Sequence, residues 1–299
     1  MKYSLVTYSI NEIGQRTNQE DSVWPAVDKS PTNSDFYVLC DGMGGHDSGE
    51  VASQAVCSSI SDYLQNHERK DGCFDETDFT AALDCAYDLL DEKDTGALKK
   101  MGTTLTFVKF HDNGCFIAHI GDSRIYHIRP SEHKVLYVTR DHSLVNDLIQ
   151  IGELTPEEAK TFNQRNVITR AMQPNQDRRA KADINNLTDI QVNDYVYMCS
   201  DGMLEQMTDN ELVNVLSMRR SDEKKISILK GATADNKDNH SAHLIRVVHI
   251  QDDEVSTQEK SVTVEEKNKP KTTGVSWIKW VIMIFSLIAA LLCVWKLLL

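Results

Sequence analysis

Four stretches of this chain run as apolar, strand-like segments that meet an aspartate at one end. Two of them lead into Asp41 and Asp201, each followed by glycine, and a third leads into Gly121-Asp122. Asp238 stands just before the last such run. Taken singly, an Asp-Gly pair after a strand is typical of an ordinary turn. Four acidic strand ends in one chain instead predict a fold that packs these ends, and their carboxylates, close together.

Carboxylates crowded in this way repel one another and destabilise a fold unless cations neutralise them. A site with oxygen donors alone suits the hard ions Mg²⁺ and Mn²⁺, whereas zinc prefers His and Cys. Two such ions can share a water molecule, lower its pKa and present it for in-line attack on phosphorus. The strand ends therefore predict a site for two ions of Mn²⁺ or Mg²⁺.

The first 251 residues alternate short runs rich in Val, Ile, Tyr and Phe with helical patterns. The expected strands are 36–40, 103–107, 115–120, 124–128, 135–138, 195–200 and 242–250. Long helices with one apolar stripe are expected over 49–66 and 78–93, with shorter helices near 141–151 and from Pro156 onward. Many strands and few long helices predict an α+β sandwich, with two sheets packed face to face and helices outside.

Charge and cysteine content narrow the functional class. The net charge of −13 argues against nucleic acid as a partner, because phosphates would repel such a surface. The seven cysteines are odd in number, form no C-x-x-C pair and often stand in apolar runs, which indicates free thiols in a reducing compartment. No N-terminal apolar stretch is long enough for a signal peptide. The main domain is therefore expected to be intracellular.

The C-terminal segment 275–299 is apolar on every side, with no charge from Trp280 to Trp295. About 20 helical residues span a hydrocarbon core of about 30 Å, and tryptophans near both ends suit the membrane interfaces. A buried core helix is the alternative, but the polar stretch 252–274 before the segment is expected to be a flexible linker. Three basic residues just before the span place the large domain on the cytoplasmic side: Lys267, Lys269 and Lys271. The predicted organisation is a catalytic domain over 1–251, a linker over 252–274 and a transmembrane helix over 275–299 in contact with lipid.

A further motif adds a cation near the N-terminus. The run from Arg16 to Asp21 places one guanidinium beside the carboxylates of Glu20 and Asp21. Arginine can hold a phosphate with two parallel hydrogen bonds. By itself, a surface salt bridge is the simpler interpretation of Arg16.

Together these motifs resemble the metal-dependent type 2C protein phosphatases (the PPM family) in their bacterial form. Single motifs are weak signals, but eight blocks occur in the family's order over about residues 1–250. They are Arg16-x-x-Asn18-x-Glu20-Asp21-Ser22, Asp41-Gly42-Met43-Gly44-Gly45-His46, Gly102-Thr103-Thr104, Gly121-Asp122-Ser123-Arg124, Asp141-His142-Ser143-Leu144-Val145, Arg165-Asn166-Val167-Ile168-Thr169-Arg170, Ser200-Asp201-Gly202 and Asp238-Asn239-x-Ser241.

The resemblance implies an αββα sandwich with a binuclear metal centre in a cleft at one edge of the sheets. Asp41 would bridge the two ions, with the Gly42 carbonyl on one ion and Asp201 and Asp238 on the other. Asp122, together with Asp201, would contribute to a third, weaker site. Of two Asp-Asn pairs near the last strand, the one at Asp238 is preferred over Asp235-Asn236, because a hydroxyl residue follows it and it stands directly before the strand.

The resemblance also assigns supporting residues. Glu20 and Asp21 would hold metal-bound waters, Arg16 would grip the substrate phosphate, and His46 would support the ligands or the fold. The stretch containing Leu144, Arg165 and Arg170 would form a mobile flap beside the cleft that influences substrate choice. Eukaryotic relatives carry His where this chain, like bacterial relatives, has Met43, so the acid that protonates the leaving group stays unassigned, with water on a metal as the candidate.

The resemblance therefore implies hydrolysis of phosphoserine and phosphothreonine on proteins by a hydroxide that bridges two metal ions, without a protein nucleophile. The expected partners are phosphorylated proteins and a bacterial serine/threonine kinase, and the catalytic domain is expected to be monomeric. One alternative is a membrane-tethered pseudophosphatase that binds phosphoproteins without turnover. Another is a regulator phosphatase with one dedicated substrate. The intact set of Asp41, Asp201 and Asp238 favours an active enzyme.

Overall fold

The computed structural model describes residues 2–44, 48–67, 69, 71–96, 100–159, 161–164 and 166–251. The predicted linker and transmembrane helix lie outside these residues. Within the described ranges, no helix is both long enough and apolar enough to cross a bilayer.

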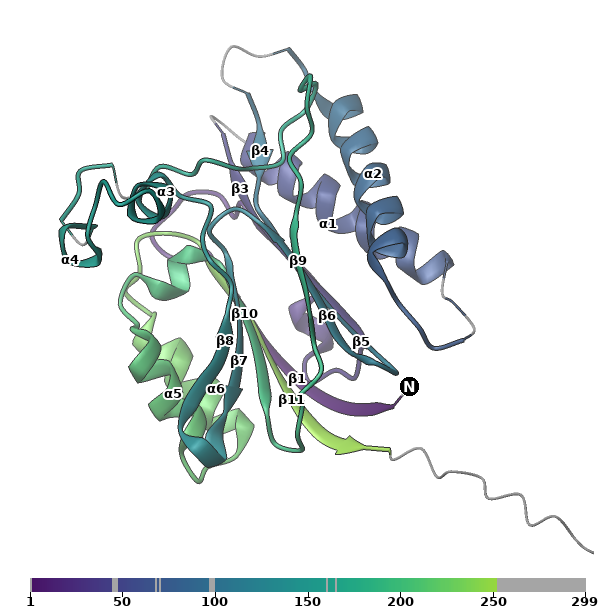
Figure 1. Ribbon diagram of the computed structural model, residues 1–299, viewed down its shortest axis with the longest axis vertical. Helices are drawn as coiled ribbons and strands as arrows, with labels where there is room; N and C mark the ends of the chain where they lie inside the picture. The colour runs from purple at the N-terminus through teal and green to yellow at the C-terminus, as the bar shows by residue number, and fades with distance from the viewer. Residues whose placement is uncertain are drawn as a thin grey trace, which may run out of the picture. The chain divides into compact units, whose positions relative to one another are not determined.

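Two antiparallel sheets form the centre of the domain (Figure 1). The first sheet has the strand order β1 (Tyr3–Glu12), β11 (His240–Ile250), β10 (Tyr195–Cys199), β7 (Arg124–Arg129) and β8 (Lys134–Val138). The second has the order β2 (Asp21–Trp24), β3 (Phe36–Met43), β5 (Leu105–His111), β6 (Gly114–Ile120) and β9 (Asp183–Leu187), with β4 (Gly102–Thr103) paired to β3. The first and last strands of the domain, β1 and β11, pair along nearly their whole length.

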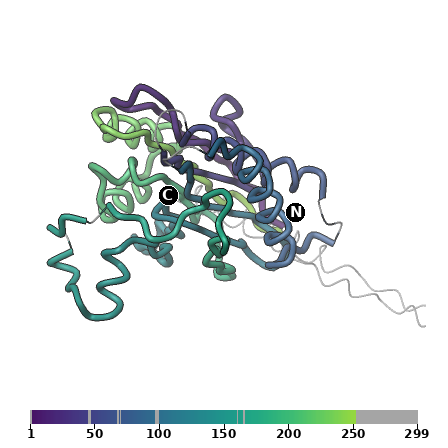
Figure 2. Tube along the Cα trace, turned by 90° about the horizontal axis from the view of Figure 1, so that it is seen from above, coloured from purple at the N-terminus to yellow at the C-terminus, as the bar shows by residue number. Residues whose placement is uncertain are grey.

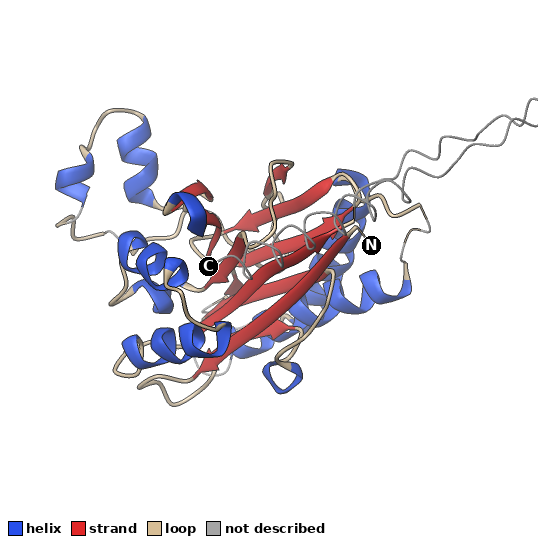
Figure 3. Cartoon of the chain, turned by 90° about the horizontal axis from the view of Figure 1, so that it is seen from below, coloured by secondary structure: helices blue, strands red, loops and turns tan. Residues whose placement is uncertain are grey.

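Helices cover both outer faces of the two sheets, which gives the predicted αββα sandwich (Figure 3). The pair α1 (Ser48–Asn66) and α2 (Glu76–Lys93) packs on the second sheet, with apolar side chains such as Ile60 and Phe79 against Phe107. The pair α5 (Asp209–Ser217) and α6 (Asp222–Ala232) packs on the first sheet. A separate apolar cluster fills the space between the sheets; it includes Leu39, Val108, Ile117, Val196 and Ile245.

The remaining elements are short. They are the helices α3 (Leu144–Gln150) and α4 (Pro156–Ala159) and the 3₁₀ turns η1 (Val27–Lys29), η2 (Pro130–Glu132) and η3 (Asp201–Leu204). The helix expected to start at Asp141 begins at Leu144, because the Ser143 side chain accepts a hydrogen bond from the Asn146 amide and caps it. The helix expected from residue 78 begins at Glu76, because Asp75 forms a capping box with Asp78. The helix start at Pro156 is confirmed.

Three strands were not anticipated from the sequence: β1, β2 and β9. The strand expected over 103–107 is divided between β4 and β5. The six cysteines in the described ranges are free thiols, in agreement with the prediction of a chain without a disulfide framework.

Candidate metal centre

The predicted carboxylates gather where strands of both sheets end. Pairing of β2 with β3 sets Asp21 opposite Asp41. The Ser200 amide donates to the Ser241 carbonyl at 3.0 Å, so the residues just before Asp201 lie beside those just after Asp238. Asp122, Asp201 and Asp238 together line a cleft of 810 Å³.

Crowding of these carboxylates raises their pKa values. Burial is the main cause for Asp41, whose pKa is raised well above its ordinary value, and repulsion from Asp21, Asp201, Asp122 and Asp238 adds to it. Asp201 is exposed overall, but protein surrounds its carboxyl group. This burial, followed by repulsion from Asp238, raises the pKa of Asp201. Burial followed by neighbouring carboxylates raises the pKa of Asp21 to about 7 and that of Asp122 to about 7. The cluster therefore disfavours its own full ionisation.

Main-chain and hydroxyl contacts fix the position of Asp41. The Thr104 amide donates to the Asp41 carbonyl at 2.8 Å, and the Asp41 amide donates to the Thr104 hydroxyl at 3.0 Å. The Thr104 hydroxyl also hydrogen-bonds the Ser123 hydroxyl at 2.8 Å. Since Ser123 follows Asp122, this chain of contacts joins the strand ends that carry Asp41 and Asp122. It gives the Gly-Thr-Thr and Gly-Asp-Ser motifs a physical role in positioning carboxylates.

Gly42 stands at a close approach of three backbone segments. A Cβ atom at this position would lie 2.1 Å from the Gly49 carbonyl oxygen and 2.6 Å from the Glu20 carbonyl oxygen. The Gly42 amide donates to that Glu20 carbonyl at 3.0 Å. Only glycine fits here, which explains the residue type after Asp41.

Asn239 holds the loop that carries Arg16. Its Nδ2 donates to the carbonyl oxygens of Ile13 at 2.8 Å and Asn18 at 3.0 Å, and its Oδ1 accepts from the Glu20 amide at 2.8 Å. Sequence reasoning recognised the Asp-Asn pair but assigned no role to the asparagine. The partners of Asn239 are more than 200 residues away along the chain, so no local pattern could have revealed them.

Arg16 reaches the carboxylate cluster. Its Nη2 lies 2.6 Å from Oδ2 of Asp238, while 55% of the side chain stays exposed. The ion pair that the sequence suggested as the simpler interpretation is therefore present, and it lies at the cleft. Arg124, the other arginine of the cleft, is held by two hydrogen bonds of 2.7 Å to Asp141. Asp41, Asp122, Asp201 and Asp238 thus outnumber the cations around them.

The donor atoms of this cluster fit divalent cations. Oδ1 of Asp21 and Oδ1 of Asp122 are buried without a hydrogen-bond partner, and a buried carboxylate oxygen without a partner is costly. Among the described residues, the side chains that line the cleft offer carboxylate oxygens and no thiolate or imidazole. Carboxylate oxygens are the donors that Mg²⁺ and Mn²⁺ prefer. The cluster therefore has both the charge and the chemistry to hold such ions.

Another group in the described part of the chain brings three candidate ligand atoms within 4.8 Å of one another: His119, His142 and Asp183. The Gly121 amide donates to Nδ1 of His142 at 3.0 Å, which leaves the proton of the neutral ring on Nε2, 3.2 Å from Asp183. Nε2 of His119 donates to the Arg140 carbonyl at 2.9 Å. The bonded Nδ1 and the protonated Nε2 leave His142 no free ring nitrogen for a metal ion.

The predicted flap extends away from the sheets between Leu144 and Arg170 (Figure 2). Its two ends are tied together, since the Leu144 amide donates to the Val167 carbonyl at 2.9 Å. Arg170 contacts Asp183 at 2.5 Å, which connects the flap to the His119–His142–Asp183 group. Asn166 of the flap lines the cleft together with the aspartates. The predicted residues Arg165 and His46 lie outside the described residues.

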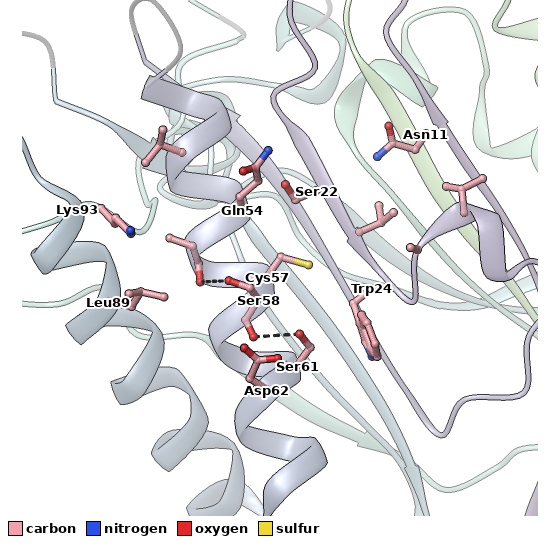
Figure 4. A pocket seen from close by; sticks show the side chains of 15 residues that line it. Asn11, Ser22, Trp24, Gln54, Cys57, Ser58, Ser61, Asp62, Leu89 and Lys93 are labelled. Carbon is pink, nitrogen blue, oxygen red and sulfur yellow. Dashed lines mark hydrogen bonds between the residues drawn. The ribbon is translucent and has the colours of Figure 1, made fainter.

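A separate groove of 960 Å³ lies between α1, α2 and β2 (Figure 4). The hydroxyls of Ser58 and Ser61 in it donate to carbonyl oxygens of the α1 backbone. Among the described residues that line it, only Asp62 and Lys93 are charged. The groove therefore lacks the converging charges of the carboxylate cleft.

Comparison with known proteins shows that the chain is similar to protein phosphatases. A family model described as protein phosphatase 2C matches residues 13–237. A putative protein phosphatase 2C-type of Streptococcus pyogenes is 32% identical over 232 residues, covering 75% of this chain and 88% of the relative. Protein phosphatase PhpP of Streptococcus pneumoniae is 32% identical over 219 residues, covering 73% of this chain and 85% of the relative.

Solved structures agree with the sequence relatives. The serine/threonine phosphatase PstP/Ppp of Mycobacterium tuberculosis superposes with a TM-score of 0.68 at 28% identity, covering 82% of this chain and 100% of that chain. The catalytic domain of PstP in complex with two manganese ions gives a TM-score of 0.67 at 27% identity, covering 82% and 99%. The similarity to each of these structures covers about four fifths of this chain.

Proposed function

We propose that this chain, which belongs to the protein phosphatase 2C family and is a serine/threonine protein phosphatase, carries out its reaction in the cleft lined by Asp122, Asp201 and Asp238. The observation that supports this site is the gathering of carboxylates from distant strands, with raised pKa values and buried oxygens that lack partners. Perturbed titratable groups in a cleft are typical of catalytic centres.

Two Mn²⁺ or Mg²⁺ ions are the cofactors, as in the relative whose structure contains two manganese ions. Asp41 would hold both ions, Asp201 and Asp238 would hold one of them, and the Gly42 carbonyl would complete the other. Asp122 is the candidate ligand for a third, weaker ion. Bound ions of this kind lower the pKa of a water and offset the charge of a phosphoryl group.

The residues of the chain itself orient the reactants. Arg16, half exposed at the cleft, would bind the phosphate of the substrate in place of its contact with Asp238. Asn239 fixes the Arg16 loop through three hydrogen bonds. Ser200 donates to Asp21 at 2.8 Å and keeps that carboxylate turned toward the cluster. The flap segment with Asn166 would close over the residues that flank the phosphorylated side chain.

The Arg16 assignment predicts a loss of substrate binding in Arg16→Ala. Hydrogen bonds to charged groups contribute about 1.5–3 kcal/mol, so kcat/KM for a phosphothreonine peptide with Mn²⁺ should fall by about 10- to 100-fold, mostly through KM. The matched control is Arg178→Ala, which removes an exposed arginine that does not line the cleft. Equal kcat/KM values for Arg16→Ala and the wild type would rule out a role of Arg16 in phosphate binding.

The expected setting is bacterial signalling by serine/threonine kinases, in which the phosphatase removes the phosphates that a kinase adds. Relatives in Mycobacterium tuberculosis and Listeria monocytogenes are named serine/threonine protein phosphatase PstP and serine/threonine phosphatase stp. The alternative of a pseudophosphatase scaffold is disfavoured, because Asp41, Asp201 and Asp238 are all present. In addition, the side chains of Asp41 and Asp201 lie within hydrogen-bonding distance of each other. The physiological substrates are proposed to be phosphoproteins near the membrane.

We further propose that residues 275–299 anchor the enzyme in a membrane with the catalytic domain in the cytoplasm. The support is the sequence itself: an apolar run that is long enough to span, with tryptophans near its ends and a basic cluster before it. The full chain should sediment with membranes and resist extraction by salt or carbonate, whereas a chain ending at Gln251 should stay soluble and active. Recovery of the full chain in the soluble fraction would disprove the anchor.

A further inference from the structure

We propose that the end of the domain farthest from the carboxylate cleft binds the anionic headgroups of a lipid bilayer through Arg219 and Arg220. These residues join α5 to α6 and line a hollow of 750 Å³ that shares no lining residue with the carboxylate cleft. The proposal rests on the membrane anchor proposed above and is independent of the metal centre.

The charged groups at the base of this hollow satisfy one another. Asp222, 8% exposed, accepts hydrogen bonds from the Tyr195 hydroxyl at 2.5 Å and from Nε of Arg246 at 2.6 Å. Lys225, 6% exposed, donates to the Tyr195 hydroxyl at 2.9 Å and to the Leu216 carbonyl at 2.7 Å. The charged groups of the base are therefore held by partners within the fold.

The rim of the hollow carries two guanidinium groups that form no ion pair with the described residues. Glu223, the other acidic residue of the lining, accepts a hydrogen bond from the Tyr8 hydroxyl. Arg219 and Arg220 are both exposed, and although the Arg220 amide donates to the Met218 carbonyl at 2.8 Å, the described residues provide neither guanidinium with a hydrogen-bond or ion-pair partner. Two adjacent, unpaired guanidinium groups on a chain of net charge −13 mark a local positive surface. Such a surface complements an anionic partner.

Exposed apolar side chains accompany the two arginines. Met218 directly precedes Arg219 and is 41% exposed. Val192, 47% exposed, precedes Asn193 of the lining. Cations interspersed with exposed apolar residues suit the interfacial region of a bilayer, where headgroups bind the cations and the apolar side chains enter the acyl boundary. Binding of a phosphopeptide would explain the cations but not the exposed apolar side chains beside them.

The last strand of the described domain ends on the side of the hollow, away from the carboxylate cleft. β11 runs from His240, beside the cleft, to Ile250 at the opposite end of the sheet, and the Gln251 amide then donates to the Lys2 carbonyl at 2.8 Å (Figure 1). β10 likewise begins at Tyr195, in the hollow, and ends next to Asp201. As the flexible linker that its composition predicts, the polar stretch 252–274 would have an r.m.s. end-to-end distance of about 26 Å between the domain and the apolar segment. Contact through Arg219 and Arg220 would therefore leave the cleft open to phosphoproteins.

The test compares full-length protein in bilayers of phosphatidylcholine alone and of equal parts phosphatidylcholine and phosphatidylglycerol. Hydrogen–deuterium exchange is measured for the amides of residues 217–224, with the flap amides as an internal reference. We expect slower exchange at 217–224 in the anionic bilayer only. Each cation near an anionic surface contributes about a fivefold change in binding, so Arg219→Ala/Arg220→Ala should weaken the contact about 25-fold and abolish the difference between bilayers. Arg178→Ala should keep it.

The outcomes separate this proposal from the others. Unaltered Mn²⁺-dependent hydrolysis of p-nitrophenyl phosphate by the double variant shows that its fold and active site are intact. Equal exchange at 217–224 in both bilayers overturns the headgroup contact, whether or not the chain is anchored. Failure of the chain to insert into the neutral bilayer overturns the anchor alone. Protection of 217–224 by a soluble phosphopeptide or by inorganic phosphate, with no effect of the anionic bilayer, overturns the membrane assignment in favour of a soluble phosphate ligand.

Discussion

Replacing Asp41 by Asn should lower the turnover number for p-nitrophenyl phosphate with Mn²⁺ by about 100-fold or more. Even residues that only support a metal ligand typically change affinity or activity by about 10- to 100-fold, and Asp41 is the carboxylate proposed to hold both ions. The fold should survive, because the contacts of Asp41 with Thr104 use the main chain of Asp41 and not its carboxylate. The apparent affinity for Mn²⁺ should fall together with the turnover number.

The control for this measurement is Asp177→Asn, which removes one exposed carboxylate that does not line the cleft. It alters net charge as Asp41→Asn does and should leave turnover unchanged. Circular dichroism of Asp41→Asn should match the wild type. If Asp41→Asn and the wild type hydrolyse the substrate at equal rates with saturating Mn²⁺, the proposed metal centre is in the wrong place.

The sequence predicted those strands of the sandwich that carry apolar runs. It missed strands whose formation depends on pairing with distant parts of the chain. β10 reads Tyr-Val-Tyr-Met-Cys, β11 contains two Val and two Ile, and both strands were expected. β9 instead reads Asp-Ile-Asn-Asn-Leu and is largely exposed at a sheet edge. An edge strand needs little apolar character, so its pattern resembles a loop. β1 and β11 lie at opposite ends of the domain sequence, and only their register shows that they pair.

In the candidate site too, some residues have a local signal in the sequence and others do not. The strand-end aspartates were visible in the sequence, because an apolar run that stops at Asp is a local signal. The supports were not: Thr104 reaches across to Ser123, and Asn239 reaches back to the loop before Glu20. These contacts depend on the packing of the two sheets, which no spacing rule encodes. The resemblance to a family supplied the motifs, while the structure supplied the reasons for them.

The stability of the metal-free protein should depend on pH through Asp21. Its pKa is raised to about 7 in the folded chain, mainly by burial, against about 3.9 in an unfolded one. The folded state therefore binds the extra proton between about pH 4 and pH 7. The contribution of Asp21 to stability is fully present below about pH 4 and is lost as pH rises through 7. The free energy of unfolding should lose up to about 4 kcal/mol from this group across that range.

Buried histidines act in the opposite direction and must be separated from Asp21. Burial lowers the pKa of His243 to about 4, so its contribution to stability is lost as the pH falls below about 6.5. Asp21→Asn leaves that histidine unchanged and keeps an oxygen that can accept the hydrogen bond from Ser200. The informative quantity is therefore the difference in the free energy of unfolding between Asp21→Asn and the wild type.

In urea titrations with a chelator, the Asp21→Asn protein should gain stability relative to the wild type as the pH rises from about 5 to about 7.5. Saturating Mn²⁺ should reduce that gain, since bound ions stabilise the ionised carboxylates of the cluster and remove the advantage of a neutral side chain. A difference between the two proteins that does not change with pH would show that Asp21 titrates normally. In that case the carboxylates do not crowd one another, and the physical argument for two cations in the cleft fails with them.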